Sequence, residues 1–239
     1  MSLVKHIPNT ITSLNLISGI LGVICAVHSM PDWALICMLA AAVFDFCDGL
    51  AARLLKAYSP IGAQLDSLAD MVSFGVLPAL MLLNCMQEHG AVSWLCYAPL
   101  FIAVMSAVRL AKFNIDTRQT TDFLGLPTPA NALLCASLAA FIAERPDCFL
   151  AGWAGAIAFI PGLSLILGLA LVSEIPMFGM KVAPGHKLLD TKRIVFLVLA
   201  VAAAVCALVV WKSWILAILL IFSIYLLENI IVSCFPQNK

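Results

Sequence analysis

Long apolar segments follow one another along almost the whole chain, and no other feature of the sequence restricts the fold as strongly. Each segment has roughly the 17–25 residues that an α-helix needs to cross the hydrocarbon core of a bilayer. Charged residues make up 11% of the chain, whereas a soluble domain has about 25%. The segments are also too long and continuous for the short alternating strands of a membrane β-barrel. We therefore predict an all-α integral membrane protein with a bundle of eight helices, at 11–29, 33–56, 62–87, 92–113, 128–145, 149–173, 194–211 and 213–233.

The lysines and arginines predict how this bundle is oriented. If the N-terminus is cytoplasmic, eleven of the 13 basic residues lie inside and only Arg145 and Lys212 lie outside, as the positive-inside rule requires. We expect a multi-pass protein of a plasma membrane, such as the bacterial inner membrane, with both termini in the cytoplasm. The first apolar segment resembles a signal peptide, but Asn9, Thr12 and Asn15 form a polar stripe on it. We therefore expect it to be retained as a helix.

Charge and cysteine usage exclude some functions. The net charge is zero and there is no basic tail, so nothing indicates binding to nucleic acid. The nine cysteines are scattered without a CxxC pair, which argues against a zinc site or a disulfide framework.

Four aspartates stand out against this apolar background. Asp45 and Asp48 share one face of the second predicted helix, and Asp66 and Asp70 share one face of the third. The connection between the two helices breaks at Tyr58-Ser59-Pro60, so we expect them to be antiparallel neighbours. The four carboxylates would then converge on one cavity near the cytoplasmic boundary of the membrane.

Carboxylates in such a setting are costly unless they are paired, solvated or bound to metal. Arg53 and Lys56 are too few to neutralise four of them, whereas divalent cations can. Oxygen ligands suit Mg²⁺, Mn²⁺ or Ca²⁺ better than zinc, and the spacing fits a two-metal site for phosphoryl transfer. The alternative is a set of interfacial charges that face the cytosol.

Small residues accompany the aspartates. Gly49, Ala52 and Gly62 either allow close helix packing, which is common in membranes, or leave room for a phosphate-bearing ligand. Their spacing alone does not separate these two interpretations.

The four aspartates belong to one longer pattern, D45-x2-D48-G49-x2-A52-R53-x8-G62-x3-D66-x3-D70. This pattern resembles the signature of the CDP-alcohol phosphatidyltransferase family. The resemblance implies at least six membrane helices, usually in a homodimer. It also implies metal-dependent transfer of a phosphatidyl group from CDP-diacylglycerol to an alcohol, with release of CMP. We expect the family core to span residues 1–193 and two additional helices to span 194–239.

Four weaker motifs narrow the resemblance to the phosphatidylserine synthase branch, whose acceptor is L-serine. They are "IPNTITSLNLISG" at 7–19, "RLAKFN" at 109–114, "FLGLPTPANA" at 123–132 and "LVSEIPMFGMK" at 171–181.

The resemblance also assigns roles to individual positions. Asp45, Asp48 and Asp66 match metal-binding aspartates, and Asp70 matches the aspartate that both contacts metal and acts as general base. The positions that it places around the CDP-diacylglycerol are Asn9, Thr12, Asn15, Gly49, Ala52, Arg53 and Gly62. The implied cofactor is Mg²⁺ or Mn²⁺, as two ions.

Serine carries a carboxylate that needs a cation or several N–H donors. Arg109 lies within an apolar run, where a charge without a function is expensive, so we favour it for acceptor binding. Lys181 is the second candidate because it lies in one of the motifs above. For Lys112 and Arg118 we favour a role as topology anchors.

Two other functions remain open at this point. A sibling enzyme would use another alcohol, such as glycerol-3-phosphate or inositol phosphate, which would require more clustered cations than serine does. A divalent-cation transporter would instead use the aspartates as an ion path and place them near the bilayer midplane, beside broken helices.

Overall fold

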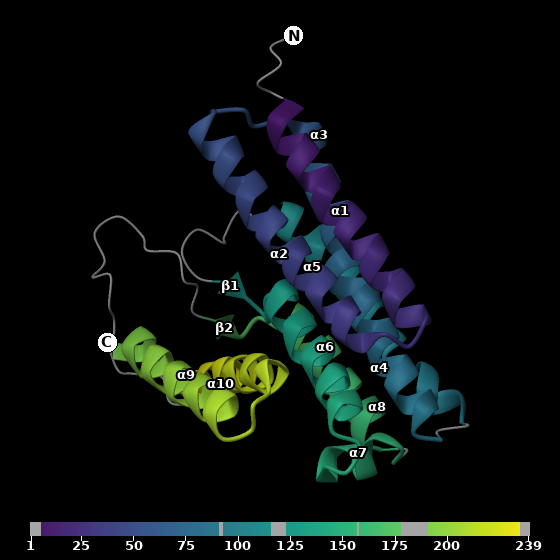
Figure 1. Ribbon diagram of the computed structural model, residues 1–239. Coiled ribbons are helices and arrows are strands. Elements are labelled where there is room, and N and C mark those ends of the chain that lie inside the picture. Colours follow the sequence, from purple (N-terminus) through teal and green to yellow (C-terminus); the bar gives the residue numbers. More distant parts are fainter. Residues whose placement is uncertain (1–5, 91–92, 116–122, 157, 178–190, 235–239) are drawn as a thin grey trace.

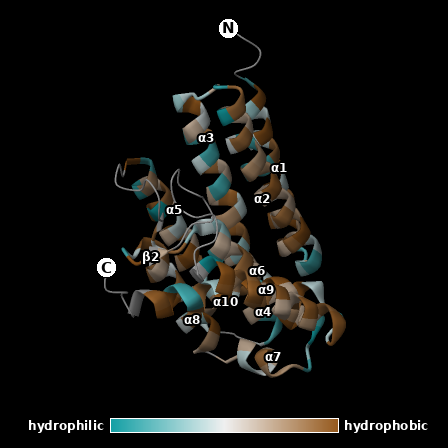
Figure 2. Ribbon diagram, turned by 90° about the vertical axis from the view of Figure 1, so that its left-hand side faces the viewer, coloured by the Kyte–Doolittle hydropathy of each residue, from teal (hydrophilic) through white to brown (hydrophobic). Residues whose placement is uncertain are grey.

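The computed structural model describes residues 6–90, 93–115, 123–156, 158–177 and 191–234. Helices account for nearly all of this structure (Figure 1), and hydrophobic residues cover most of their length (Figure 2). Five of the helical stretches are long and apolar enough to cross a membrane: His6–Val27, Pro31–Leu54, Pro60–Glu88, Trp94–Ile115 and Trp214–Val232. Three shorter apolar helices cover Thr128–Glu144, Phe159–Val172 and Arg193–Val209. The prediction of a polytopic helical membrane protein is confirmed.

The first two helices form an antiparallel hairpin. Helix α1 covers His6–Val27 and α2 covers Pro31–Leu54, and they are packed along much of their length (Figure 1). Gly22 permits this approach, because a Cβ there would lie 3.2 Å from the Cβ of Cys37 and 2.5 Å from Cδ2 of Leu77. Proline begins α2, at a position where its missing N–H leaves no helical hydrogen bond unmade.

The third stretch contains three consecutive helical segments. These are α3 (Pro60–Asp70), the π-helix η2 (Met71–Val76) and α4 (Leu77–Glu88). Pro78 has no N–H to donate to the carbonyl of Phe74, and its ring displaces that carbonyl. The π-helix η2 directly precedes this part of the chain, and the N–H of Leu77 donates to the carbonyl oxygen of Val72, five residues before it.

The fourth stretch is interrupted near its start. A single 3-10 turn, η3 (Trp94–Tyr97), precedes helix α5 (Leu100–Ile115). The prediction placed one helix at 92–113, and Pro99 separates the two parts.

Helix α6 (Thr128–Glu144) is the centre of the bundle. Nearly every residue from Asn131 to Ile142 is buried, as expected of a helix that is apolar on all sides. It packs against α2, α4 and η2 on one side and α10 (Trp214–Cys234) on the other. Helix α10 in turn pairs with α9 (Thr191–Val209).

The prediction of one continuous helix at 149–173 is wrong. The chain forms α7 (Phe149–Ala154) and then α8 (Phe159–Val172). The break falls at Gly155, whose Cβ position lies 2.4 Å from the carbonyl oxygen of His89, so the chain passes directly over that backbone. Pro161 in the first turn of α8 suits a new helix start.

A two-stranded ribbon joins the loop before α6 to the end of α8. Strand β1 (Phe123–Leu124) pairs antiparallel with β2 (Pro176–Met177). Gly125 has φ +77°, and a Cβ there would lie 2.6 Å from the carbonyl oxygen of Leu171, so only glycine fits without strain. The ribbon thereby fixes where α6 begins.

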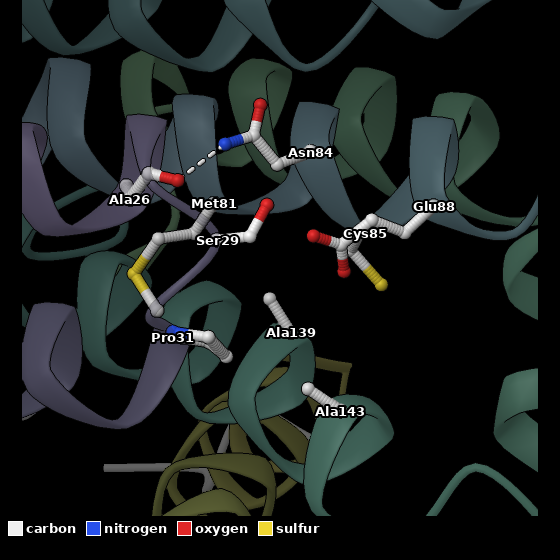
Figure 3. A pocket seen from close by; sticks show the side chains of 9 residues that line it. All are labelled: Ala26, Ser29, Pro31, Met81, Asn84, Cys85, Glu88, Ala139 and Ala143. Carbon is white, nitrogen blue, oxygen red and sulfur yellow. Dashed lines mark hydrogen bonds between the residues drawn. The ribbon is translucent and has the colours of Figure 1, made fainter.

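A small cavity of about 20 Å³ lies at the end of the bundle where α1 turns into α2 (Figure 3). Nδ2 of Asn84 donates a 2.6 Å hydrogen bond to the carbonyl oxygen of Ala26 at its edge. Asn84 thus ties α4 to the last turn of α1, because Ala26 lies one residue from the end of that helix.

Close packing of α1 on η2 generates a prediction about stability. A Cβ at Gly19 would lie 2.2 Å from Oγ and 3.0 Å from Cα of Ser73, so Gly19→Ala must push the two helices apart. We expect a loss of about 1–3 kcal/mol in the free energy of unfolding, measured as a lower melting temperature of the purified protein. Gly162→Ala is the matched control, because nothing lies within 4 Å of its Cβ position. Equal melting temperatures for the two variants would contradict this packing.

Candidate active site

The aspartate pairs come from the second half of α2 and the second half of α3, where Asp70 is the last residue. Between them the chain reverses through Lys56, which has φ +49°. Oγ of Ser59 then caps α3 by accepting a 3.0 Å hydrogen bond from the amide N of Gly62. Pro60 follows as the first residue of the helix. These local signals start α3 at the position that brings Asp66 opposite α2.

Carboxylate oxygens of Asp45, Asp48 and Asp66 lie within 4.8 Å of one another. Oδ2 of Asp48 and Oδ1 of Asp66 are buried and have no hydrogen-bond partner. A buried oxygen without a partner is costly, and a cation that binds all three residues would remove that cost. The donor set contains oxygen alone, which is the set that Mg²⁺, Mn²⁺ and Ca²⁺ prefer. The cluster therefore fits a divalent metal ion.

Asp70 lies one helical turn beyond Asp66 and is held by a separate network. Its Oδ1 accepts a 3.1 Å hydrogen bond from Nδ2 of Asn15, which is fully buried. Oγ of Ser73 donates a 2.8 Å hydrogen bond to Oδ1 of Asn15. Asn15 thus orients Asp70, and Ser73 in the π-helix orients Asn15.

The two helices predicted to be neighbours, α2 and α3, face each other across a cavity. Helix α1 packs on both of them, and the space between α2 and α3 is a cavity of about 210 Å³. Its lining comes from α1, the end of α2, the 57–59 connection and α3: Pro8, Asn9, Thr12, Asp48, Gly49, Ala52, Ala57, Tyr58, Ser59, Gly62, Ala63 and Asp66. We call it the donor cavity, because the resemblance described above places CDP-diacylglycerol around several of these residues.

The two glycines of the donor cavity have different surroundings. A Cβ at Gly62 would lie 2.8 Å from Oδ1 of Asn9, so this glycine allows α1 and α3 to pack closely. A Cβ at Gly49 would have only the flexible end of Arg53 nearby, at 3.9 Å. Gly49 therefore leaves open space beside the aspartates. Arg53 does not line the donor cavity; its Nε donates to the carbonyl oxygen of Gly49.

A second and larger cavity, of about 740 Å³, opens on the other side of α3. Asp45, Asp66 and Asp70 line its polar end, and Ala63 and Asp66 line both cavities. Residues of α5, α6, α9 and α10 form the remaining walls, which are mostly apolar. We call it the acceptor cavity, because Arg109, the residue predicted to bind the acceptor, lines it. The prediction of one cavity for four aspartates thus becomes two cavities that meet at Asp66.

Arg109 of α5 lines the acceptor cavity and is 8% exposed. Its Nη1 donates a 2.9 Å hydrogen bond to Oγ1 of Thr128, the first residue of α6. The sequence did not single out Thr128 individually, although it lies within the 123–132 motif. Lys181, the other predicted acceptor ligand, lies outside the described residues.

Comparison with known proteins identifies the relatives of this chain. The family model for CDP-alcohol phosphatidyltransferase matches residues 5–170. The CDP-diacylglycerol–serine O-phosphatidyltransferase of Mycobacterium bovis is 33% identical over 214 residues, which cover 86% of this chain and 73% of that protein. The protein of the same name from Helicobacter pylori is 31% identical over 237 residues, covering 97% of this chain and 95% of its own.

An archaeal relative carries a related name. The archaetidylserine synthase of Methanothermobacter thermautotrophicus is 32% identical over 148 residues, covering 60% of this chain and 63% of that protein. The family model covers well over half of the chain, including every aspartate of the cluster and both sides of the donor cavity. The chain therefore belongs to the CDP-alcohol phosphatidyltransferase family.

Proposed function

We propose that this protein is a phosphatidylserine synthase, which transfers the phosphatidyl group of CDP-diacylglycerol to the hydroxyl of L-serine and releases CMP. The observation that supports it best is the aspartate cluster at the junction of two cavities. A transfer between two substrates needs two compartments that meet at the reacting atoms, and Asp66 lies where these two meet. The bacterial relatives named above have this activity in their names.

Asp45, Asp48, Asp66 and Asp70 would hold divalent metal, as two ions of Mg²⁺ or Mn²⁺. When bound, such ions neutralise charge on the pyrophosphate and on the CMP leaving group. The donor cavity has room for the CDP group beside Gly49 and Ala52. Asn9 and Thr12 of α1 line the same cavity and offer polar contacts to it.

The acceptor cavity would hold serine. Asp70 takes the proton of the serine hydroxyl, because removal of that proton as the new bond forms lowers the barrier for a weak nucleophile. The hydrogen bond from Asn15 to Oδ1 holds the carboxylate in place and leaves Oδ2 to receive the proton. The serine oxygen then attacks the lipid-side phosphorus, and CMP leaves.

Charge in the acceptor cavity favours serine over a phosphorylated alcohol. Of the described residues that line it, Arg109 is the single cation. One guanidinium matches the single carboxylate of serine, whereas glycerol-3-phosphate or inositol phosphate would call for more positive charge. The family assignment removes the cation transporter as an alternative.

We also propose the arrangement in the membrane. The family core of residues 1–193 and the added pair of helices in 194–239 would assemble as a homodimer, with the aspartates and both termini on the cytoplasmic side. Reporter fusions to the C-terminus test the orientation, and an external location of the reporter would reject it. Light scattering of the purified protein tests the dimer, and a monomeric mass would reject it.

The central test is the choice of acceptor. Purified protein is incubated with CDP-diacylglycerol and Mn²⁺, and CMP release is measured with serine, glycerol-3-phosphate, inositol phosphate or no alcohol. We expect CMP release well above the background rate only in the reaction that contains serine. Phosphatidylserine should form in the same reaction. Release with a different alcohol would keep the reaction class and reject the acceptor, and no release with any alcohol would reject the enzyme.

The role of Asp70 as base leads to a second prediction. Asp70→Asn keeps the shape of the side chain but cannot accept the proton, so we expect turnover to fall by about 10²–10⁴-fold. The melting temperature and the elution volume on gel filtration should stay close to those of the unsubstituted protein. Asp32→Asn, at the exposed start of α2, is the control and should keep full activity. Substantial activity in Asp70→Asn would show that another group takes the proton.

Metal binding can be followed without turnover. We expect the electron paramagnetic resonance signal of free Mn²⁺ to decrease as the protein is added, because the aspartates bind the ion. Asp66→Asn should weaken this binding at least about tenfold, since it removes a charged ligand next to Asp45 and Asp48. Asp32→Asn again serves as control. Chelation with EDTA should abolish CMP release, and equal Mn²⁺ affinity in the two variants would place the metal elsewhere.

A further inference from the structure

The far wall of the acceptor cavity comes from the last two helices of the chain. Six described residues of α9 and α10 line it: Phe196, Leu197, Ala200, Ile221, Phe222 and Tyr225. These helices lie beside α6 (Figure 1), and α10 packs directly on it. They also lie beyond residue 170, where the match to the family model ends. The cavity that holds the acceptor is therefore completed by a part of the chain outside the matched region.

Arg109 brings an incompletely satisfied guanidinium to this cavity. Its Nη1 is bonded to Thr128, whereas its Nε is buried without a hydrogen-bond partner. A buried N–H of a charged group that lacks an acceptor is expensive. An anionic ligand in the cavity would supply that acceptor, and a carboxylate matches the two-pronged geometry of a guanidinium.

Tyr225 lines the same cavity as this guanidinium and is 9% exposed. Arg109 and Tyr225 are also electrostatic neighbours. The ring of Phe196 packs edge-on against the ring of Tyr225, with centroids 5.9 Å apart and planes at 75°. Phe196 thus restricts the position of the phenol, and a fixed O–H donor loses little entropy when it binds a ligand.

We propose that the hydroxyl of Tyr225 and the guanidinium of Arg109 together bind the carboxylate of the amino-acid acceptor. The α9–α10 hairpin is then a specificity element of the active site as well as part of the membrane anchor. Thr128 acts as a positioning residue, because it holds Nη1 of Arg109 and leaves Nε for the ligand. This inference rests on the proposed function, since it assumes that the acceptor is serine.

Tyr225→Phe tests the role of the hydroxyl and keeps the aromatic packing on Phe196. We expect the KM for serine to rise about tenfold, as for the loss of one hydrogen bond to a charged group. The kcat and the KM for CDP-diacylglycerol should change less than about twofold. Serinol has a hydroxyl and an amine but no carboxylate, so with serinol as acceptor the substitution should change nothing.

Tyr97→Phe is the matched control. Tyr97 lies in η3 and is 56% exposed, and it does not line the acceptor cavity. Its kinetics with both acceptors should equal those of the unsubstituted protein.

Three outcomes separate this inference from the proposed function. An unchanged KM for serine in Tyr225→Phe overturns the inference while phosphatidylserine synthesis by the unsubstituted protein stands. An equal rise of the KM for serine and of the KM for serinol also overturns the inference. Tyr225 would then shape the cavity without binding the carboxylate. If the unsubstituted protein releases no CMP with serine, the proposed function itself fails.

Discussion

The cost of placing carboxylates inside a membrane protein governs the structure of this chain. Asp48 and Asp66 each bury a carboxylate oxygen that has no hydrogen-bond partner among the described residues. Apolar packing does not offset the free-energy cost of burying a charged group without a partner. The fold brings the oxygens of three aspartates within 4.8 Å of one another. Together they fit a divalent cation, the kind of ion that assists chemistry at a pyrophosphate.

Helix α1 makes this arrangement possible although it contributes none of the aspartates. It packs on both α2 and α3, and it forms one wall of the donor cavity between those two helices. The polar stripe of α1 has two roles. Asn9 and Thr12 face the donor cavity, whereas Asn15 reaches Asp70 and Ser73. Gly19 then lets α1 approach the π-helix closely enough for these hydrogen bonds to form.

Much of this fold could be predicted from periodicity and local signals. Apolar length indicated eight helical stretches, and Ser59 with Pro60 marked the start of α3 because both act locally. The π-helix was missed, although Pro78 was visible as a residue that interrupts helical hydrogen bonds. The break at Gly155 was missed because its reason is a close approach to His89, which is distant in sequence.

The site was predicted in part. The spacing of the aspartates indicated which of them share a face, and three meet as expected. The sequence did not indicate that a third helix, α1, packs on both α2 and α3 beside the cavity between them. No pattern in the sequence pointed to Tyr225, since its place beside Arg109 depends on how α10 packs against α6. Short-range signals do not report such tertiary contacts.

The two cavities have walls of different origin, and this has a consequence for how such an enzyme can change. Every described residue of the donor cavity lies within residues 5–170, the region that the family model matches. Residues of α9 and α10, outside that region, form one wall of the acceptor cavity. Under the proposed function, a substitution in that wall would alter which alcohol fits and would leave the aspartates and the donor cavity untouched. New acceptors would then arise through the C-terminal hairpin, at sites where a mutation does not threaten the shared reaction.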